Sequence, residues 1–195
     1  MAGYGDIRKI GSGNIGATNV LRTGRKDLAL LTVLLDASKA GFAAWLALRF
    51  VPAEDMFFAG IFTSTNLVAA LYAGTAAIIG HNFPVWLKFK GGKGVLVAAG
   101  AILAIQPVLL PFLAIIFLVC LIPTGMVSLG SVAMAALYPV LTIIYGSLQG
   151  YAAGDMLVCA IGSGFMSGMV IYMHRANIQR IREGKEYRFG KHNKK

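Results

Sequence analysis

Charge is scarce in this sequence. Only 13% of the 195 residues are charged, whereas a typical soluble domain carries about a quarter. Acidic residues are the rarest part of that share, because 8 Asp and Glu stand against 18 Lys and Arg. Hydrophobic residues reach 57% of the chain, and the mean hydropathy is +0.70. This balance excludes an ordinary soluble domain and indicates an integral membrane protein.

Cysteine is also nearly absent. The two cysteines, Cys120 and Cys159, each lie inside an apolar run and have no second Cys at metal-ligand spacing. We therefore expect inert core thiols, and we predict neither a metal site nor a cofactor. A cleavable signal peptide is not expected, since residues 1–27 are polar, Gly-rich and basic.

The net charge of +10 raises the question of a nucleic-acid partner. The basic residues, however, stand in a few blocks between apolar runs instead of covering one face of a globular domain. Blocks of this kind suit anionic lipid head groups or phosphorylated substrates. We predict those partners, with no nucleic acid and no obligate protein partner.

Long apolar runs recur along the whole chain. A helix needs about 20 apolar residues to cross the hydrocarbon layer. Four runs meet that length: residues 28–50, 57–80, about 131–145 with flanks, and 151–173. Since no polar segment marks off a second unit, we predict one all-α domain over residues 1–195, a polytopic bundle of membrane helices.

The distribution of Lys and Arg predicts which ends of these helices face the cytoplasm. Cytoplasmic loops are enriched in both residues, and three clusters occur, at residues 8–26, 88–93 and 175–195. Glu54 and Asp55 lie between the first two spans, which suits the opposite side. We therefore expect both basic loops and the C-terminus to be cytoplasmic.

Residues 95–122 form an apolar stretch too long for one ordinary span, and both Gln106-Pro107 and Pro111 lie where a helix would break. Since both flanking basic clusters are assigned to the cytoplasm, the chain must cross an even number of times between them. We therefore predict two short crossings, 95–106 and 108–122, which makes six crossings in all. Short or partly inserted helices of this kind usually line a cavity.

The first basic loop reads GSGNIGATNVLR from Gly11 to Arg22. Glycines let backbone N–H groups converge on phosphate oxygens, and Ser, Asn and Arg side chains add further donors. We interpret the run as an anion-binding loop, with a Gly-rich turn that packs on neighbouring helices as the alternative. The spacing of Gly11, Gly13 and Gly16 also fits a dinucleotide-binding fingerprint, but that motif requires a soluble βαβ unit, and this run precedes a membrane span.

The second basic loop reads GHNFPVWLKFKGGKGV from Gly80 to Val95. Its last glycines would open the next helix, whose N-terminus offers free N–H groups and a favourable dipole to an anion. Lys93 adds a full positive charge at the same point. Trp86 and the neighbouring Phe residues are interpreted as membrane-interface anchors in preference to ligand-stacking groups.

The C-terminal tail begins HRANIQRI at His174. Helical spacing would put His174 and Asn177 on one face as the last span leaves the membrane, so both could reach one ligand. The alternative is a solvated basic tail that is attracted to anionic lipids, and that interpretation is preferred for residues 191–195.

Two charged residues lie near the middle of the first span. Asp36 and Lys39 are three residues apart on one helical face, at a depth where an isolated charge is costly. We expect them to pair with each other. Whether the pair only holds helices together or borders the active cavity stays open.

Taken together, the three loops resemble those of the bacterial membrane acyl-phosphate:glycerol-3-phosphate acyltransferases, and the resemblance covers nearly the whole chain. One motif could arise by chance, but three in order on a polytopic chain are specific, and HRANIQRIREGKE from His174 to Glu186 completes the set. The resemblance implies transfer of a fatty acyl group from acyl phosphate to the sn-1 hydroxyl of glycerol 3-phosphate, the first step of phospholipid synthesis. The products would be lysophosphatidic acid and phosphate, formed at the bacterial inner membrane.

The resemblance also implies roles for particular residues. Phosphate groups would be held by a catalytic set from all three loops: Ser12, Arg22, Lys93, His174 and Asn177. Substrate-binding positions would be Gly11, Asn14, Asn19, His81, Gly91, Gly92, Gly94 and Ser128. Within this second group, the glycines that flank Lys93 would form a backbone cradle for the acyl phosphate. The proton acceptor stays open between a substrate phosphate and His174.

Members of this family usually carry seven membrane helices, the first of them ahead of the Gly-rich loop, whereas six are predicted here. The resemblance therefore implies either a truncated N-terminus or a misassigned start. The competing function is an anion or phosphate-ester transporter, since half-helices and glycine breaks beside basic residues also build transport sites. Polar side chains that continue through the bilayer would favour the transporter, but here they crowd one face.

Overall fold

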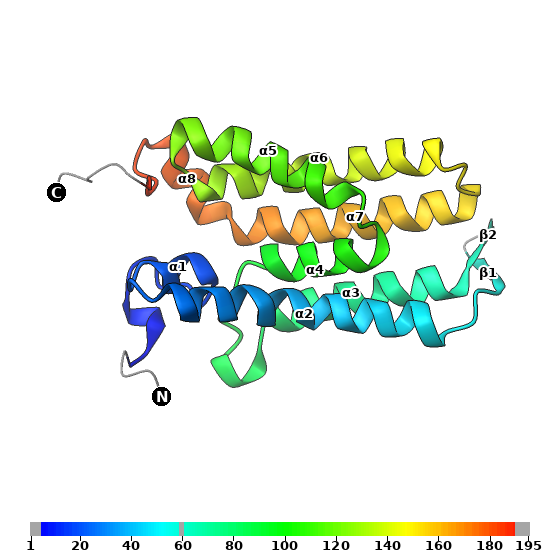
Figure 1. Ribbon diagram of the computed structural model, residues 1–195, viewed down its shortest axis with the longest axis horizontal. Coiled ribbons are helices and arrows are strands. Elements are labelled where there is room, and N and C mark those ends of the chain that lie inside the picture. Colours follow the sequence, from blue (N-terminus) through cyan, green and yellow to red (C-terminus); the bar gives the residue numbers. More distant parts are fainter. Residues whose placement is uncertain (1–4, 59–60, 190–195) are drawn as a thin grey trace.

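Four long apolar helices run along the length of the bundle in this computed structural model, which describes residues 5–58 and 61–189 (Figure 1). They are α2 (Lys26–Phe50), α3 (Thr65–Asn82), α6 (Val127–Leu148) and α7 (Ala153–Met173). Each is long and apolar enough to cross a membrane. The predicted polytopic bundle of membrane helices is therefore confirmed.

The predicted span over residues 57–80 is wrong for its first part. Strands β1 (Asp55–Phe58) and β2 (Ile61–Ser64) pair antiparallel there, and α3 begins only at Thr65. Aromatic and β-branched residues favour such a pairing. Asp155, in the first turn of α7, holds the hairpin by accepting hydrogen bonds from Thr63 Oγ1 at 2.8 Å and from the Ser64 N–H at 2.7 Å. Apolar composition alone does not distinguish such strands from a helix end.

Two shorter helices occupy residues 95–124. Helix α4 (Val95–Ile105) and helix α5 (Leu109–Thr124) are separated by the break predicted at Pro107. The break predicted at Pro111 is wrong, because Pro111 lies in the first turn of α5, where a missing backbone N–H is tolerated. The 11 residues of α4 extend about 16 Å, less than the roughly 30 Å of the hydrocarbon core. Figure 1 shows the α4–α5 turn partway along the bundle, short of the end that carries β1 and β2. The pair thus returns to the end where it began, as the charge pattern requires, while the count of six crossings stays a prediction.

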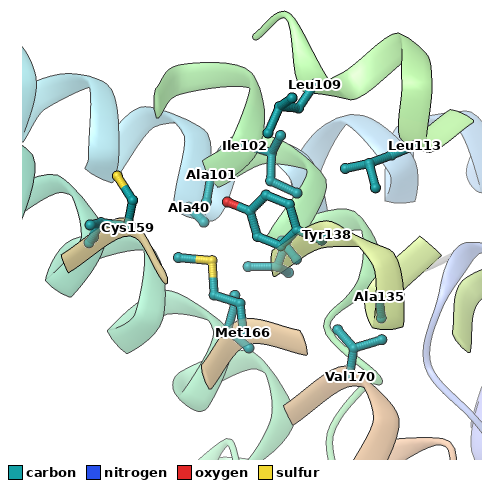
Figure 2. Close-up of a cluster of buried hydrophobic side chains, with 14 of the residues drawn as sticks. Ala40, Ala101, Ile102, Leu109, Leu113, Ala135, Tyr138, Cys159, Met166 and Val170 are labelled. Atoms are coloured by element: carbon teal, nitrogen blue, oxygen red, sulfur yellow. The ribbon is translucent and has the colours of Figure 1, made fainter. Parts of the chain in front are cut away.

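A cluster of buried apolar side chains fills the middle of the bundle. Figure 2 shows members from five helices: Ala40, Ile102, Leu113, Tyr138 and Met166. Cys159 is buried in the same cluster, as expected of a core thiol, whereas Cys120 is only half-buried. Close packing of the side chains in this cluster helps to hold the helices of the bundle together.

The remaining short helices bring the three sequence motifs to one end of the bundle. Helices α1 (Ala17–Leu21) and α8 (Arg175–Arg182) lie at the end opposite the β1–β2 hairpin (Figure 1). The single-turn helices η1 (Ile7–Lys9) and η2 (Val85–Leu87) belong to the first and second basic loops. Residues 191–195, predicted to be a solvated basic tail, lie outside the described residues.

Helices α2 and α4 touch backbone to backbone. A Cβ atom on Gly100 would overlap the carbonyl oxygen of Ala37, and one on Gly41 would come within 3.0 Å of the Gly100 carbonyl oxygen. The glycines therefore let α4 approach α2 more closely than any side chain would permit. This approach brings the N-terminal end of α4, and with it Lys93, against the first membrane helix.

We expect Gly100→Ala to lower the free energy of unfolding by about 1–3 kcal/mol, because the added methyl group forces α2 and α4 apart. Gly164→Ala is the matched control. Gly164 faces open space on α7, so the same change should be neutral or stabilise by up to about 1 kcal/mol. Thermal unfolding in detergent can be followed by thiol labelling of buried Cys159 in a Cys120→Ser background. Equal effects of the two substitutions would contradict the close contact.

Candidate active site

A cavity of about 640 Å³ opens at the end of the bundle that carries the motifs. All three motif loops line it. The five predicted catalytic residues are all on its wall: Ser12, Arg22, Lys93, His174 and Asn177. Six predicted substrate-binding residues line it as well: Gly11, Asn14, Asn19, His81, Gly94 and Ser128. The structure therefore brings together groups that are more than 150 positions apart in the sequence.

The Gly-rich loop is folded around the side chain of Asn19, which is only 2% exposed. Its Oδ1 accepts a hydrogen bond from the Ser12 N–H at 2.9 Å, and its Nδ2 donates to the carbonyl oxygens of Ile10 and Asn14 at 2.9 and 2.7 Å. Gly11 has a φ of 58°, and a Cβ there would overlap Asn19 Oδ1. Asn19 therefore uses its side chain to shape the loop.

This folding leaves Ser12 exposed on the cavity wall. The Asn14 side chain accepts a hydrogen bond from the Gly16 N–H at 2.9 Å, in the turn just ahead of helix α1. At the other end of α1, the Arg22 guanidinium lies over the Tyr187 ring, 4.0 Å from its centroid. Arg22 Nε is buried and has no hydrogen-bond partner among the residues that the structure describes. A charged donor held in this way is suited to receive an anion.

A hydrogen-bond network centred on Glu186 connects the second and third motifs. Lys93 Nζ donates to Asn177 Oδ1 at 2.7 Å, and Asn177 Nδ2 donates to Glu186 Oε1 at 2.6 Å. Ser128 Oγ on α6 donates to the same carboxylate oxygen at 2.8 Å. Arg180 Nε donates to the other oxygen, also at 2.8 Å. Asn177 thus connects a cation from one loop to a carboxylate from another.

The pKa shifts of Lys93 and Glu186 favour a positive charge on the lysine and a negative charge on the carboxylate at pH 7. Burial lowers the pKa of Lys93 to about 8, with Glu186 opposing the shift and Arg180 and Arg22 adding to it. Lys93 therefore remains largely protonated at pH 7. Burial alone would raise the pKa of Glu186, but the hydrogen bonds from Asn177, Ser128 and Arg180 outweigh it and lower the pKa. The carboxylate is therefore ionised.

His174 has a fixed orientation and a low basicity. Its Nδ1 lies 2.8 Å from the carbonyl oxygen of Val170, so Nδ1 carries the proton and Nε2 is left as an acceptor. Burial, reinforced by the nearby charge of Lys93, lowers the pKa of His174 to about 4. The imidazole is therefore neutral at pH 7 and is able to accept a hydrogen bond in the cavity.

Of the three glycines predicted to form a cradle for the acyl phosphate, one lines the cavity and two do not. Gly94 lines the cavity at the N-terminus of α4, with a φ of 76°. Gly91 and Gly92 are not among the lining residues and instead pack on His81. A Cβ on Gly92 would overlap the His81 ring, and the Gly92 N–H donates to the His81 carbonyl oxygen at 3.1 Å. These two glycines let the loop close against α3.

Asp36 and Lys39 pair as expected, with Lys39 Nζ 2.7 Å from Asp36 Oδ1. The same carboxylate oxygen lies 3.6 Å from His81 Nδ1. Both Asp36 and His81 line the cavity. The question left open by the sequence is therefore answered, because the intramembrane pair borders the site and also joins α2 to α3.

Sequence reasoning does not single out four further residues of the cavity wall: Arg180, Lys185, Glu186 and Tyr187. All four follow Asn177, in a stretch where repeated basic residues suggest a solvated surface. One signal was available, because Glu186 is among only 8 acidic residues in the chain. A carboxylate within a basic segment is a candidate for a structural partner of those cations.

The fold and the cavity together define a class of protein: a polytopic membrane protein with a cavity lined by basic side chains at one end of its helical bundle. Residues 1–184 match the protein family described as "Glycerol-3-phosphate acyltransferase". The chain belongs to this family of membrane acyltransferases.

Similar proteins agree with this assignment along nearly the whole chain. A glycerol-3-phosphate acyltransferase from Rhizobium etli is 42% identical over 189 residues, covering 97% of this chain and 81% of the relative. One from Maricaulis maris is 44% identical over 191 residues, covering 97% and 77%. The crystal structure of PlsY (YgiH), an integral membrane glycerol 3-phosphate acyltransferase, in its glycerol 3-phosphate form superposes with a TM-score of 0.75 at 31% identity, covering 95% of this chain and 82% of that one. Acyl transfer is therefore favoured over the transporter alternative.

We expect Glu186→Gln to lower the free energy of unfolding by about 2 kcal/mol, because it removes the charge that faces Arg180 and places an amide donor against other donors. The matched control is Glu183→Gln in the same tail. Glu183 is exposed and pairs with Lys185 at 3.1 Å, so its loss should cost under about 0.5 kcal/mol. Thermal unfolding followed by thiol labelling of Cys159 measures the stability of both variants. Equal losses of unfolding free energy would contradict the role of Glu186 as the centre of the hydrogen-bond network.

Proposed function

We propose that this protein transfers a fatty acyl group from acyl phosphate to the sn-1 hydroxyl of glycerol 3-phosphate, which yields lysophosphatidic acid and inorganic phosphate. The observation that carries the proposal is the convergence of Arg22 and Lys93, from different motif loops, on one cavity of a membrane acyltransferase. Both proposed substrates carry phosphate groups that repel each other. Two separate cations in one cavity offset that repulsion and let the substrates approach.

The donor needs no protein nucleophile, because acyl phosphate is already an activated acyl compound. The glycerol 3-phosphate hydroxyl oxygen attacks the acyl carbonyl carbon, a new C–O ester bond forms, and the bond from that carbon to the phosphate oxygen breaks. Positioning of the two substrates supplies much of the rate enhancement in such a reaction. Lys93 and the N-terminal N–H groups of α4, beginning beside Gly94, would stabilise the departing phosphate.

The hydroxyl proton has two candidate acceptors. His174 Nε2 is unprotonated at pH 7, but its low pKa makes it a weak base. The departing phosphate is a stronger base and leaves the site with the product. Both alternatives stay open, with His174 at least able to hold the hydroxyl by accepting its hydrogen bond. Ser12 and Asn177 would complete the phosphate contacts, whereas Asn19 is assigned to loop shape.

The acyl tail has an apolar path next to the cavity. A narrow pocket of about 60 Å³ lies between α4, α5, α6 and α7, and Val95 lines both the pocket and the cavity. The end of a fatty chain would enter there or remain among the lipids. We place the cavity on the cytoplasmic side of a bacterial inner membrane, because the basic loops concentrate at that end.

The middle of the bundle supports an enzyme over a transport pathway. Buried polar side chains such as Gln106 and Thr142 lie between the two ends, but they are uncharged, and Thr142 Oγ1 donates to Gln106 Oε1 at 3.2 Å. A transporter would need polar contacts there for a charged ligand. Chemistry at one membrane face requires no such pathway.

Phosphate release by the purified protein tests the proposal. Given palmitoyl phosphate and glycerol 3-phosphate together, the protein should release phosphate, and Lys93→Met should slow that release by about a hundredfold or more. Lys26→Met is the matched control, since Lys26 is exposed and outside the cavity lining. Palmitoyl-coenzyme A in place of palmitoyl phosphate should give no transfer. Equal transfer from both donors would contradict the proposed donor.

Activity should also fall as Lys93 loses its proton. Because its pKa is lowered to about 8, Lys93 is positively charged below that pH and becomes neutral as the pH rises through it. We therefore expect kcat/KM for acyl phosphate to decline above pH 8. Lys93→Arg keeps its charge throughout this range, so any activity it retains should show no such decline. An unchanged alkaline limb in the variant would assign the titration to another group.

A further inference from the structure

The segment that joins α3 to α4 projects from the side of the bundle. Figure 1 shows it as the green loop beyond α2, extending away from the helices and not past their end. It contains residues 84–90, which include the single-turn helix η2, and we call it the side loop. A loop that leaves a membrane bundle sideways near its polar end enters the layer occupied by lipid.

The side chains of the side loop combine two chemical kinds. Trp86 is 84% exposed, and Val85 and Phe89 are 67% and 61% exposed. Lys88 and Lys90 are exposed beside them. Three large apolar side chains and two lysines in one short projection would be unfavourable in water, but they fit a boundary with hydrocarbon on one side and phosphate on the other.

Many backbone N–H groups of the side loop, and of Gly91 and Gly92 at its base, are hydrogen-bonded within the protein. Six consecutive N–H groups, from residues 87 to 92, donate to carbonyl oxygens of the same segment or of the end of α3, at distances between 2.9 and 3.2 Å. A segment in contact with bulk water has no need of so many paired N–H groups in a row. A segment in a water-poor layer does, because unpaired backbone groups are costly there.

Two residues of the side loop have backbone conformations that are unfavourable for their residue types. Lys88 and Phe89 have φ values of 54° and 59°, in the left-handed region that side chains with a Cβ disfavour. Two successive residues of this kind fix the directions in which Lys88 and Phe89 point. Strained positions of this sort persist where the surrounding structure or a ligand requires them.

We propose that the side loop is embedded in the interfacial layer of the membrane, with Val85, Trp86 and Phe89 in contact with lipid chains and Lys88 and Lys90 at lipid phosphates. Aromatic rings and lysines are the residues that membrane interfaces favour. Anionic lipids supply the charge that complements the two lysines. The occupant of this surface is therefore lipid, and a second copy of the chain is an outcome that the test below distinguishes.

Embedding the side loop in the membrane interface would also position one side of the cavity. Backbone hydrogen bonds from Gly91 and Gly92 to the end of α3 tie the base of the side loop next to His81 and Lys93. An anchored side loop would therefore hold the Lys93 side of the cavity level with the lipid phosphates. This step rests on the proposed function, since that is the level at which an acyl phosphate in the bilayer carries its head group.

Tryptophan fluorescence tests the anchor without reference to catalysis. The chain has two tryptophans, Trp45 and Trp86, so Trp45→Phe leaves Trp86 as the reporter. The full chain would be reconstituted in vesicles of phosphatidylcholine and phosphatidylglycerol that contain lipids brominated near the head group or deep in the chain. We expect shallow bromines to quench Trp86 about twofold more strongly than deep ones, as an interfacial ring requires, and aqueous iodide to quench it little.

Two controls define the result. Trp86→Phe leaves Trp45, which is 50% exposed on α2 and should be quenched by brominated lipid in every preparation. Lys88→Gln with Lys90→Gln should raise iodide quenching of Trp86 in the anionic vesicles, and no change would overturn the role of the lysines. Strong iodide quenching with no effect of brominated lipid would put the side loop in water and overturn the proposal. Protection of Trp86 from both quenchers would assign the surface to a second protein chain and overturn it equally.

Discussion

The carboxylate of Glu186 opposes the positive charge that Arg22, Lys93 and Arg180 bring to the cavity. Without it, cations from three segments of the chain would repel one another around a single cavity. Its two oxygens accept three hydrogen bonds of 2.6 to 2.8 Å, one of them from Asn177, which in turn receives Lys93. The C-terminal tail is thereby part of the cavity wall, and its hydrogen bonds hold the second and third motif loops together.

The membrane supplies the second constraint. Long helices carry apolar side chains to lipid and to one another, so polar chemistry is confined to the end where the basic loops meet. Helix α4 is short and begins at Gly94 on the cavity wall, and its close contact with α2 brings its N-terminus near Asp36. The site proposed for phosphorylated ligands therefore lies next to hydrocarbon, where the proposed donor would have both its phosphate head and its fatty tail accommodated.

Local signals in the sequence predicted the features that local physics controls. The break at Pro107 followed from a missing backbone N–H, and the Asp36–Lys39 pair from helical spacing. Hydropathy failed at residues 57–64 because short apolar strands and helix ends have the same composition. The shaping role of Asn19 and the central place of Glu186 depend on contacts between distant segments, 58 positions apart for Ser128 and Glu186, and periodicity carries no signal of such contacts. The motif resemblance predicted a catalytic set whose members all line the cavity, but it did not separate such residues from Gly92, which packs on His81 behind the wall.

The central claim is that one cavity holds both phosphate groups, one near Arg22 and the other near Lys93. A crystal structure with glycerol 3-phosphate and a non-hydrolysable acyl phosphonate bound together tests it most directly. The account predicts two phosphorus positions inside the cavity, on opposite sides of the site, with the acyl carbonyl carbon between the acceptor hydroxyl and Lys93. A structure in which the two ligands occupy the same position in turn, or in which one binds outside the cavity, would contradict it.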